Sequence, residues 1–185
     1  GAQMGLELNY ARFRGGQVGF YRTSDRTIQL QGQYNFIKDG NGPIGFSTVI
    51  NVDGTDNFSD EFSPGVALVL SRELGDRGAI YLQPSWIGNT NLITDEGDDY
   101  TAMAGLGLRF RAARNTYLFV EGSPRFAGYD PGVTLISFGF EQRAGGHVFQ
   151  LNFSNGFGPT LAQVARGGSR RDDWYLGFNL SRKFY

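Results

Sequence analysis

The sequence predicts an all-β protein, an antiparallel up-and-down transmembrane β-barrel of about ten to twelve strands. Three observations carry this prediction. Apolar and polar residues alternate in about eleven segments of roughly ten residues, the length that a tilted strand needs to cross a bilayer. The polar face of these segments is mostly uncharged, which is typical of a wet lumen. Glycine is abundant at 28 residues, and aromatic residues make up 15% of the chain, as expected where glycine relieves crowding and aromatic side chains form interfacial girdles.

Composition narrows the class of protein further. The 185 residues suit a single domain over 1–185, and the formal net charge of -1 gives no overall field that would attract nucleic acid. The absence of cysteine excludes disulfides and thiolate metal sites. Lys38 and Lys183 are the only lysines among 17 basic residues. Because soluble β-proteins usually cover their edges with Lys and Glu, this scarcity favours a membrane barrel over a soluble barrel with its apolar face inward.

The clearest strand runs from Thr27 to Ile37. Successive side chains of a strand point to opposite faces, so one face is apolar and the other is polar. The apolar face holds Ile28, Leu30, Tyr34 and Phe36, and the polar face holds Gln29, Gln31, Gln33 and Asn35. The same pattern predicts strands at 4–12, 17–23, 27–37, 43–52, 64–73, 78–87, 100–111, 116–124, 132–143, 146–155 and 173–184. Pro84 lacks a ladder donor and predicts a bulge or lost pairing, whereas 116–124 leaves its apolar face ambiguous.

The connections between these strands mostly alternate in length. The longer ones are 53–63, 88–99, 125–131 and 156–172, and Pro159 to Arg166 predicts one or two helical turns in the last of them. Bacterial barrels place short turns in the periplasm and long loops outside. If the last strand runs inward, the strand at 4–12 also runs inward. Either Gly15-Gly16 is a kink and the count is ten, or one further strand precedes Gly1; we favour the second, a twelve-strand barrel whose first strand is missing from this chain.

Two C-terminal segments, Gly146 to Asn155 and Gly177 to Arg182, carry a family resemblance, and Gly5 to Leu8 with Val18 to Ser24 match more weakly. They resemble a family of uncharacterised bacterial outer-membrane β-barrel proteins, a domain of unknown function. The resemblance implies a barrel in the outer membrane, with membrane lipid as its surroundings, and brings neither a cofactor nor catalytic residues. The chain end is similar to the aromatic insertion signal read by the barrel-assembly machinery, with Trp174, Phe178, Phe184 and Tyr185 as its aromatic residues, although the apolar alternation ends at Phe184.

The charges that alternation places toward the lumen are the strongest functional candidates. Arg109 and Arg111 lie opposite an apolar face, and Glu141 and Glu121 are candidates on neighbouring strands; Arg22 is a weaker one. Such groups can form a constriction filter in which arginine favours anions. They can equally form a neutralising ion-pair network that closes the lumen, because an unpaired charge in a narrow lumen is costly. The sequence leaves both open.

The uncharged lumen candidates are Gln29, Gln31, Gln33, Asn152 and Asn179. They can line a water-filled passage, or the two asparagines can satisfy neighbouring backbone and fix the register of adjacent strands.

Other candidate groups favour structural roles. His147, the only histidine, shares a face with Phe149 and has no nucleophile beside it in the sequence, so an interfacial role is expected. Two acidic loops, with Asp53, Asp56, Asp60 and Glu61 in one and Asp95, Glu96, Asp98 and Asp99 in the other, lack EF-hand spacing and are expected to be solvated. Arg166, Arg170 and Arg171 are expected in a solvated loop, with a phosphate group or a partner as alternative contacts.

These observations predict a narrow pore or passive transport barrel for ions or small solutes. The alternative is a structural barrel that binds envelope proteins through loop 156–172. An outer-membrane lipid hydrolase or acyltransferase is disfavoured by the position of His147.

Overall fold

The computed structural model describes residues 3–38, 42–93, 97–156, 158–168 and 170–183. Within these ranges the chain forms twelve strands and one short α-helix, α1 (Leu161–Arg166), together with 3-10 turns at Asp56–Phe58 and Gly75–Arg77. The strands are β1 (Gly5–Phe13), β2 (Gly16–Thr23), β3 (Ile28–Ile37), β4 (Gly45–Gly54), β5 (Phe62–Glu73), β6 (Gly78–Gly88), β7 (Tyr100–Ala113), β8 (Thr116–Ser123), β9 (Arg125–Gly128), β10 (Leu135–Ala144), β11 (His147–Ser154) and β12 (Tyr175–Arg182). None of the helical segments in these ranges is both long and apolar enough to cross a membrane.

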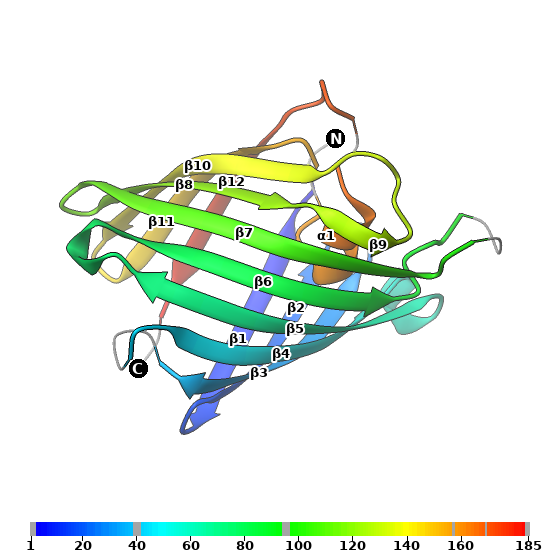
Figure 1. Ribbon diagram of the computed structural model, residues 1–185, viewed down its shortest axis with the longest axis horizontal. Helices are drawn as coiled ribbons and strands as arrows, with labels where there is room; N and C mark the ends of the chain where they lie inside the picture. The colour runs from blue at the N-terminus through cyan, green and yellow to red at the C-terminus, as the bar shows by residue number, and fades with distance from the viewer. Residues whose placement is uncertain (1–2, 39–41, 94–96, 157, 169, 184–185) are drawn as a thin grey trace.

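The strands form one curved antiparallel sheet in the order β1-β2-β3-β4-β5-β6-β7-β8-β10-β11-β12 (Figure 1). The antiparallel all-β fold predicted from the alternation is therefore confirmed. The alternative of ten strands is wrong, because Gly15 adopts a φ of 87° in a turn that separates β1 from its antiparallel partner β2. Long loops gather at one end of the sheet and short turns at the other (Figure 1). We call these the loop end and the turn end.

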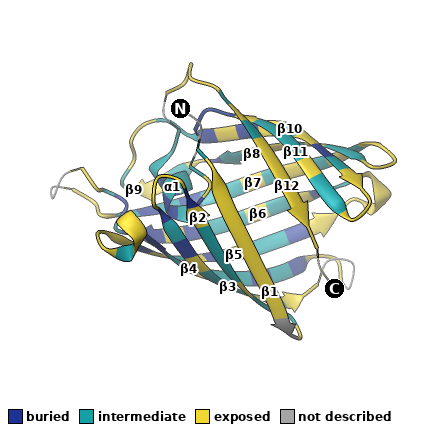
Figure 2. Ribbon diagram, turned by 180° about the vertical axis from the view of Figure 1, so that it is seen from behind, coloured by how far each residue is buried: buried dark blue, intermediate teal, exposed yellow. Residues whose placement is uncertain are grey.

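The sheet has two edges, β1 and β12, and among the described residues these two strands form no ladder with each other. Because every neighbouring pair along the path is antiparallel, β1 and β12 run in the same direction, from the loop end to the turn end (Figure 2). A single strand antiparallel to both would join the edges. The further strand expected before Gly1 stays a prediction.

Two prolines shape the ladders around β6, β7 and β8. Next to Pro84, β6 keeps its pairing with β7 but loses pairs to β5 between Ala67↔Ser85 and Leu70↔Leu82, as its missing donor predicted. Pro124 ends β8, and β9 then continues along β7, with Met103 opposite Arg125. This short strand lies where the sequence predicted only a loop, because the alternation after Pro124 is too brief to detect.

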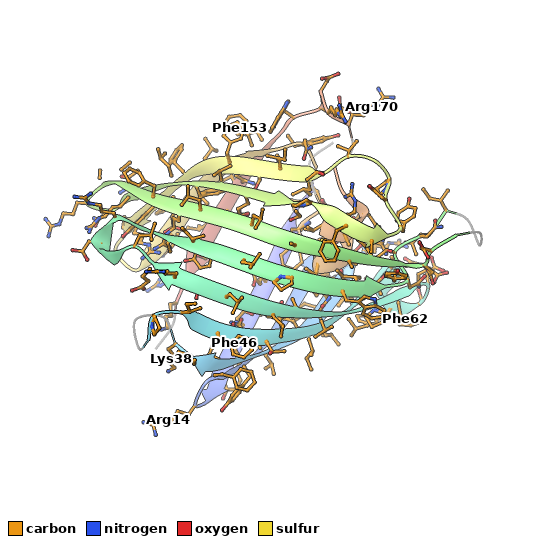
Figure 3. The ribbon with its side chains drawn as sticks, in the orientation of Figure 1. Arg14, Lys38, Phe46, Phe62, Phe153 and Arg170 are labelled. Atoms are coloured by element: carbon orange, nitrogen blue, oxygen red, sulfur yellow. The ribbon has the colours of Figure 1, made fainter. Side chains whose placement is uncertain are left out.

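The apolar face of the alternation points away from the interior. Leu106 on β7 is 50% exposed, and Leu118 and Val120 on β8 are 50% and 45% exposed. The apolar face that the sequence left ambiguous at 116–124 is therefore the one with Leu118 and Val120, and Tyr117 and Phe119 point inward. Bands of exposed and covered residues alternate along the inner strands of the sheet such as β6 and β7, whereas the edge strands β1 and β12 are mostly exposed (Figure 2). The side chains of Phe153 and Phe62 project from the outer surface (Figure 3).

Aromatic side chains gather on this outer face toward both ends of the sheet. At the loop end the Trp86 and Tyr100 rings stack with centroids 6.4 Å apart, and the Phe138 and Trp174 rings meet edge to face at 5.5 Å. At the turn end Phe36 contacts Tyr34 and Phe46 at centroid distances of 4.9 and 5.2 Å. Between the two groups the outer face is largely aliphatic on β3 to β8, whereas Phe140 and Phe178 lie at mid-strand on β10 and β12. Paired aromatic girdles around an aliphatic band match the two interfaces and the hydrocarbon core of a bilayer.

Candidate functional site in the barrel lumen

The helix α1 fills the loop end of the lumen. Its N-terminus is set by a capping box, in which the Thr160 side chain accepts from the Gln163 amide and the Gln163 side chain accepts from the Thr160 amide. Ala162 and Ala165 are fully buried against Ile87 and Met103 of the barrel wall. The last long loop thus folds back into the barrel (Figure 1), and α1 packs its apolar side against the wall.

Asp53 attaches the start of α1 to the wall. It is 2% exposed, and its Oδ2 accepts from the Ala162 amide at 3.1 Å. Its Oδ1 accepts from Gln29 Nε2 at 2.8 Å and from Asn51 Nδ2 at 3.1 Å. The expectation that Asp53 belongs to a solvated acidic loop is wrong. Strand β4 continues to Gly54, so alternation turns this carboxylate inward, where three donors compensate its desolvation.

Arg166 attaches the other end of α1. Its Nη2 donates to Ser63 Oγ at 2.8 Å and to the Asn89 carbonyl at 3.5 Å, and its Nε donates to the Thr90 carbonyl at 3.4 Å. Burial lowers the pKa of the Arg166 guanidinium, while the nearby Asp53 carboxylate opposes that shift. The expectation of a solvated Arg166 is therefore wrong, whereas Arg170 and Arg171 of the same loop are exposed.

A cluster of charges lies on the inner wall toward the turn end. The Glu141 side chain is only 9% exposed, and its Oε1 lies 2.7 Å from Arg143 Nε and 3.9 Å from Arg109 Nη1. Both guanidinium groups lie over the Tyr117 ring, at 4.5 Å for Arg109 and 4.9 Å for Arg143. Two of the predicted lumen charges, Arg109 and Glu141, therefore meet, and Arg143 completes the group. Alternation signals Arg143, which lies two residues beyond Glu141 on the same face.

The other predicted charges, Arg111 and Glu121, form no ion pair with this cluster. Arg111 turns toward the short turn, where it donates to the carbonyls of Ala113 and Arg114. Glu121 is exposed, and its Oε2 accepts from Ser137 Oγ at 3.3 Å. Arg22 was wrongly predicted as a lumen candidate, since it pairs with Leu6 and Ile28 on the outer face and donates to Asn57.

The uncharged candidates lie on the inner face, and most of them bond to other polar side chains of the wall. Gln31 donates to Asn9 at 3.4 Å, and Gln33 donates to Asn35 at 3.1 Å. Asn179 donates to Gln150 across β11 and β12 at 3.3 Å. Asn152 packs against Gly177, where a Cβ would lie 2.3 Å from Asn152 Oδ1. The lumen wall at these positions is thus polar and uncharged.

The remaining candidates lie outside the lumen. His147 begins β11 on the outer face, 6.2 Å from the Phe149 ring. Asp56 forms an exposed ion pair with Arg26 at 2.8 Å. In the described parts of the chain no group of three or more His, Asp or Glu side chains could hold a metal ion. Trp174 and Phe178 are exposed on the outer face, and Asp95, Glu96, Phe184 and Tyr185 fall outside the described residues.

The fold, with an apolar exterior, paired aromatic girdles and a polar interior, defines the class of membrane β-barrel domains. The sequence matches the family described as membrane bound beta barrel domain (DUF5777) over residues 1–184, and the chain belongs to that family. The resemblance read from the sequence is thereby confirmed. The family is a membrane-bound barrel domain of unknown function. No curated protein and no solved structure matches the chain.

Proposed function

We propose that this protein is a narrow pore of the bacterial outer membrane, which passes ions or small solutes and whose outer mouth is gated by α1. The observation that carries the proposal is the attachment of α1 inside the lumen by Asp53 and Arg166. Barrels with a polar interior are plugged by a loop or a helix when they do not conduct freely. A short helix held by a few hydrogen bonds is the kind of element that leaves its site at moderate cost.

The Arg109, Glu141 and Arg143 cluster supports a second constriction nearer the turn end. Glu141 pairs with both arginines, so the cluster is partly neutralised, keeps one positive charge and narrows the passage, which combines the two alternatives that the sequence left open. The same proposal places the protein in the outer membrane, with its short turns in the periplasm and its outer face in contact with membrane lipid. It also includes insertion by the barrel-assembly machinery. The exterior girdles and the loop lengths support these points.

The conductance of the full-length protein in a planar bilayer tests this function. We expect small and infrequent openings from the wild type. Arg166→Ala removes hydrogen bonds from a charged donor, which are worth roughly 1.5–3 kcal/mol, so openings should become about 10 to 150 times more frequent. Arg170→Ala, in the exposed part of the same loop, should behave as the wild type.

A silent Arg166→Ala barrel that still shows heat-modifiable gel mobility would contradict the gate and favour a structural barrel. The specific observation behind that second candidate is the pair of sheet edges, β1 and β12, which can recruit a strand from a partner protein. Because α1 lies inside the lumen, the contacts of loop 156–172 with an envelope partner would fall mainly to the exposed Arg170 and Arg171.

A further inference from the structure

A cavity of about 200 Å³ opens on the inner wall beside the charge cluster. Its polar and aromatic lining comes from Tyr81, Arg109, Phe119, Glu121, Glu141 and Gln150, on five different strands. Gly107 leaves this space open, because it has no side chain. A Cβ at this position would fit into the space, 3.5 Å from Tyr81 Cβ and 3.8 Å from Glu121 Cγ, and would occupy part of it. The volume lies below the roughly 300–1,000 Å³ of typical ligand pockets, so only a compact solute fits.

Arg109 offers unused donors to this cavity. Its Nε is buried and has no hydrogen-bond partner among the described residues. Its Nη1 lies 3.9 Å from Glu141 Oε1, beyond hydrogen-bond distance, because Arg143 takes that oxygen at 2.7 Å. The guanidinium stacks on the Tyr117 ring, which fixes its plane. A carboxylate is the group that matches two parallel N–H donors of a fixed guanidinium.

Glu121 offers acceptors on the neighbouring strand. One of its oxygens accepts a long bond of 3.3 Å from Ser137. It pairs with Gly107 in the β7–β8 ladder and is therefore diagonal to Arg109, a position roughly 7–8 Å away in Cα separation. The two side chains form no ion pair with each other, although each carries a charge. A donor group of a ligand, such as an ammonium, fits beside Glu121.

The charges around the cavity cancel, since Arg109 and Arg143 balance Glu121 and Glu141. A solute that carried only one charge would leave one of these side chains unbalanced in a narrow lumen, where an unpaired charge is costly. A solute that carries both a positive and a negative group keeps the balance.

We propose that this cavity binds a compact zwitterion, with its carboxylate on Arg109 and its ammonium on Glu121; an α-amino acid is the simplest member of that class. Passage of such a solute through the barrel rests on the pore function proposed above. Binding of the solute rests only on the geometry of Arg109, Glu121 and Gly107.

Equilibrium binding to the folded full-length protein in detergent at neutral pH tests the proposal, with titration calorimetry or ligand-observed nuclear magnetic resonance as readout. Three probes separate the ligand groups: glycine has both charges, acetate only the negative one and ethylammonium only the positive one. We expect glycine to bind at least about tenfold more tightly than either of the others, since each charge-assisted contact that is lost weakens binding by roughly that factor.

Two variants and one matched control locate the site. Arg109→Gln should abolish the preference for glycine. Glu121→Gln keeps the shape of the side chain and should weaken glycine about tenfold while acetate binds as well as before or better, a pattern that misfolding would not produce. Arg72→Gln, an exposed arginine on the outer face at the same end of the barrel, should leave all three affinities unchanged.

Acetate binding equal to glycine binding, or glycine binding unchanged by Arg109→Gln, would overturn the proposal, as would failure of all three probes to bind. Binding of glycine by a barrel that conducts in no variant would keep this site and remove the pore. Conduction without glycine binding would do the reverse.

Discussion

Replacement of Asp53 by asparagine should release α1 from the lumen. The substitution keeps the size of the side chain and one acceptor oxygen, which can still serve Gln29 and Asn51. The Asp53 oxygen that accepts from the Ala162 amide at 3.1 Å is replaced by the NH2 group of asparagine. This NH2 and the Ala162 amide are both donors, so the hydrogen bond is lost. A buried amide left without an acceptor costs about 1–3 kcal/mol, which raises the ratio of released to docked helix by roughly 5- to 150-fold.

Thiol labelling measures this ratio directly, because the chain contains no cysteine. Ala165 is 0% exposed in the docked helix, so a cysteine introduced there reacts only when α1 leaves. When docking is fast relative to labelling, the labelling rate follows the released population. We expect the Ala165→Cys protein to label about 5- to 150-fold faster when Asp53→Asn is also present.

Two controls separate release of the helix from general loosening. A cysteine at the exposed Arg170 should label at the same rate in both backgrounds. Asp56→Asn removes an exposed ion pair with Arg26 and should not change labelling at position 165. An unchanged rate at position 165 in the Asp53→Asn protein would refute the reasoning, and equal acceleration by Asp56→Asn would show that the whole barrel had loosened.

Two further predictions concern the barrel wall. Leu106→Arg, on the exposed outer face near mid-strand, should lower the free energy of unfolding in lipid by roughly 2–4 kcal/mol. Gln31→Arg, on the inner face, should lower it much less. Equal losses for the two variants in urea titrations would show that the faces are misassigned. Gly139→Ala should lower the free energy of unfolding by about 1–3 kcal/mol, because the added Cβ would lie 2.1 Å from the Leu151 carbonyl oxygen. Gly122→Ala, whose added Cβ would have no atom closer than 3.9 Å, should change it by no more than about 0.5 kcal/mol in the same titration.

The sequence predicted the wall of this barrel well because alternation is a local signal. Each predicted strand overlaps an observed one, and Leu30, Tyr34 and Phe36 of the apolar face predicted for 27–37 are exposed on the outer face. The residues that bind α1 escaped prediction because their partners are distant: Asp53 bonds to Ala162, which lies 109 residues further along the chain. The segment Pro159 to Arg166 predicted a helical turn, but no local signal placed that helix inside the lumen.

The size of the inner side chains explains why α1 docks where it does. At the loop end the wall offers small residues: Ser63 and Ala67 are each 1% exposed, and Gly65 lies between them on β5. A Cβ at Gly65 would come within 3.3 Å of Leu161 Cδ2, so the helix uses space that a larger wall residue would fill. Without α1 this region would be a void, and voids in packed interiors are costly. At the turn end, Tyr81, Arg109 and Phe119 reach inward and leave room only for a small solute. The gradient from small to large inner residues thus places α1 at one end of the lumen and the small cavity at the other.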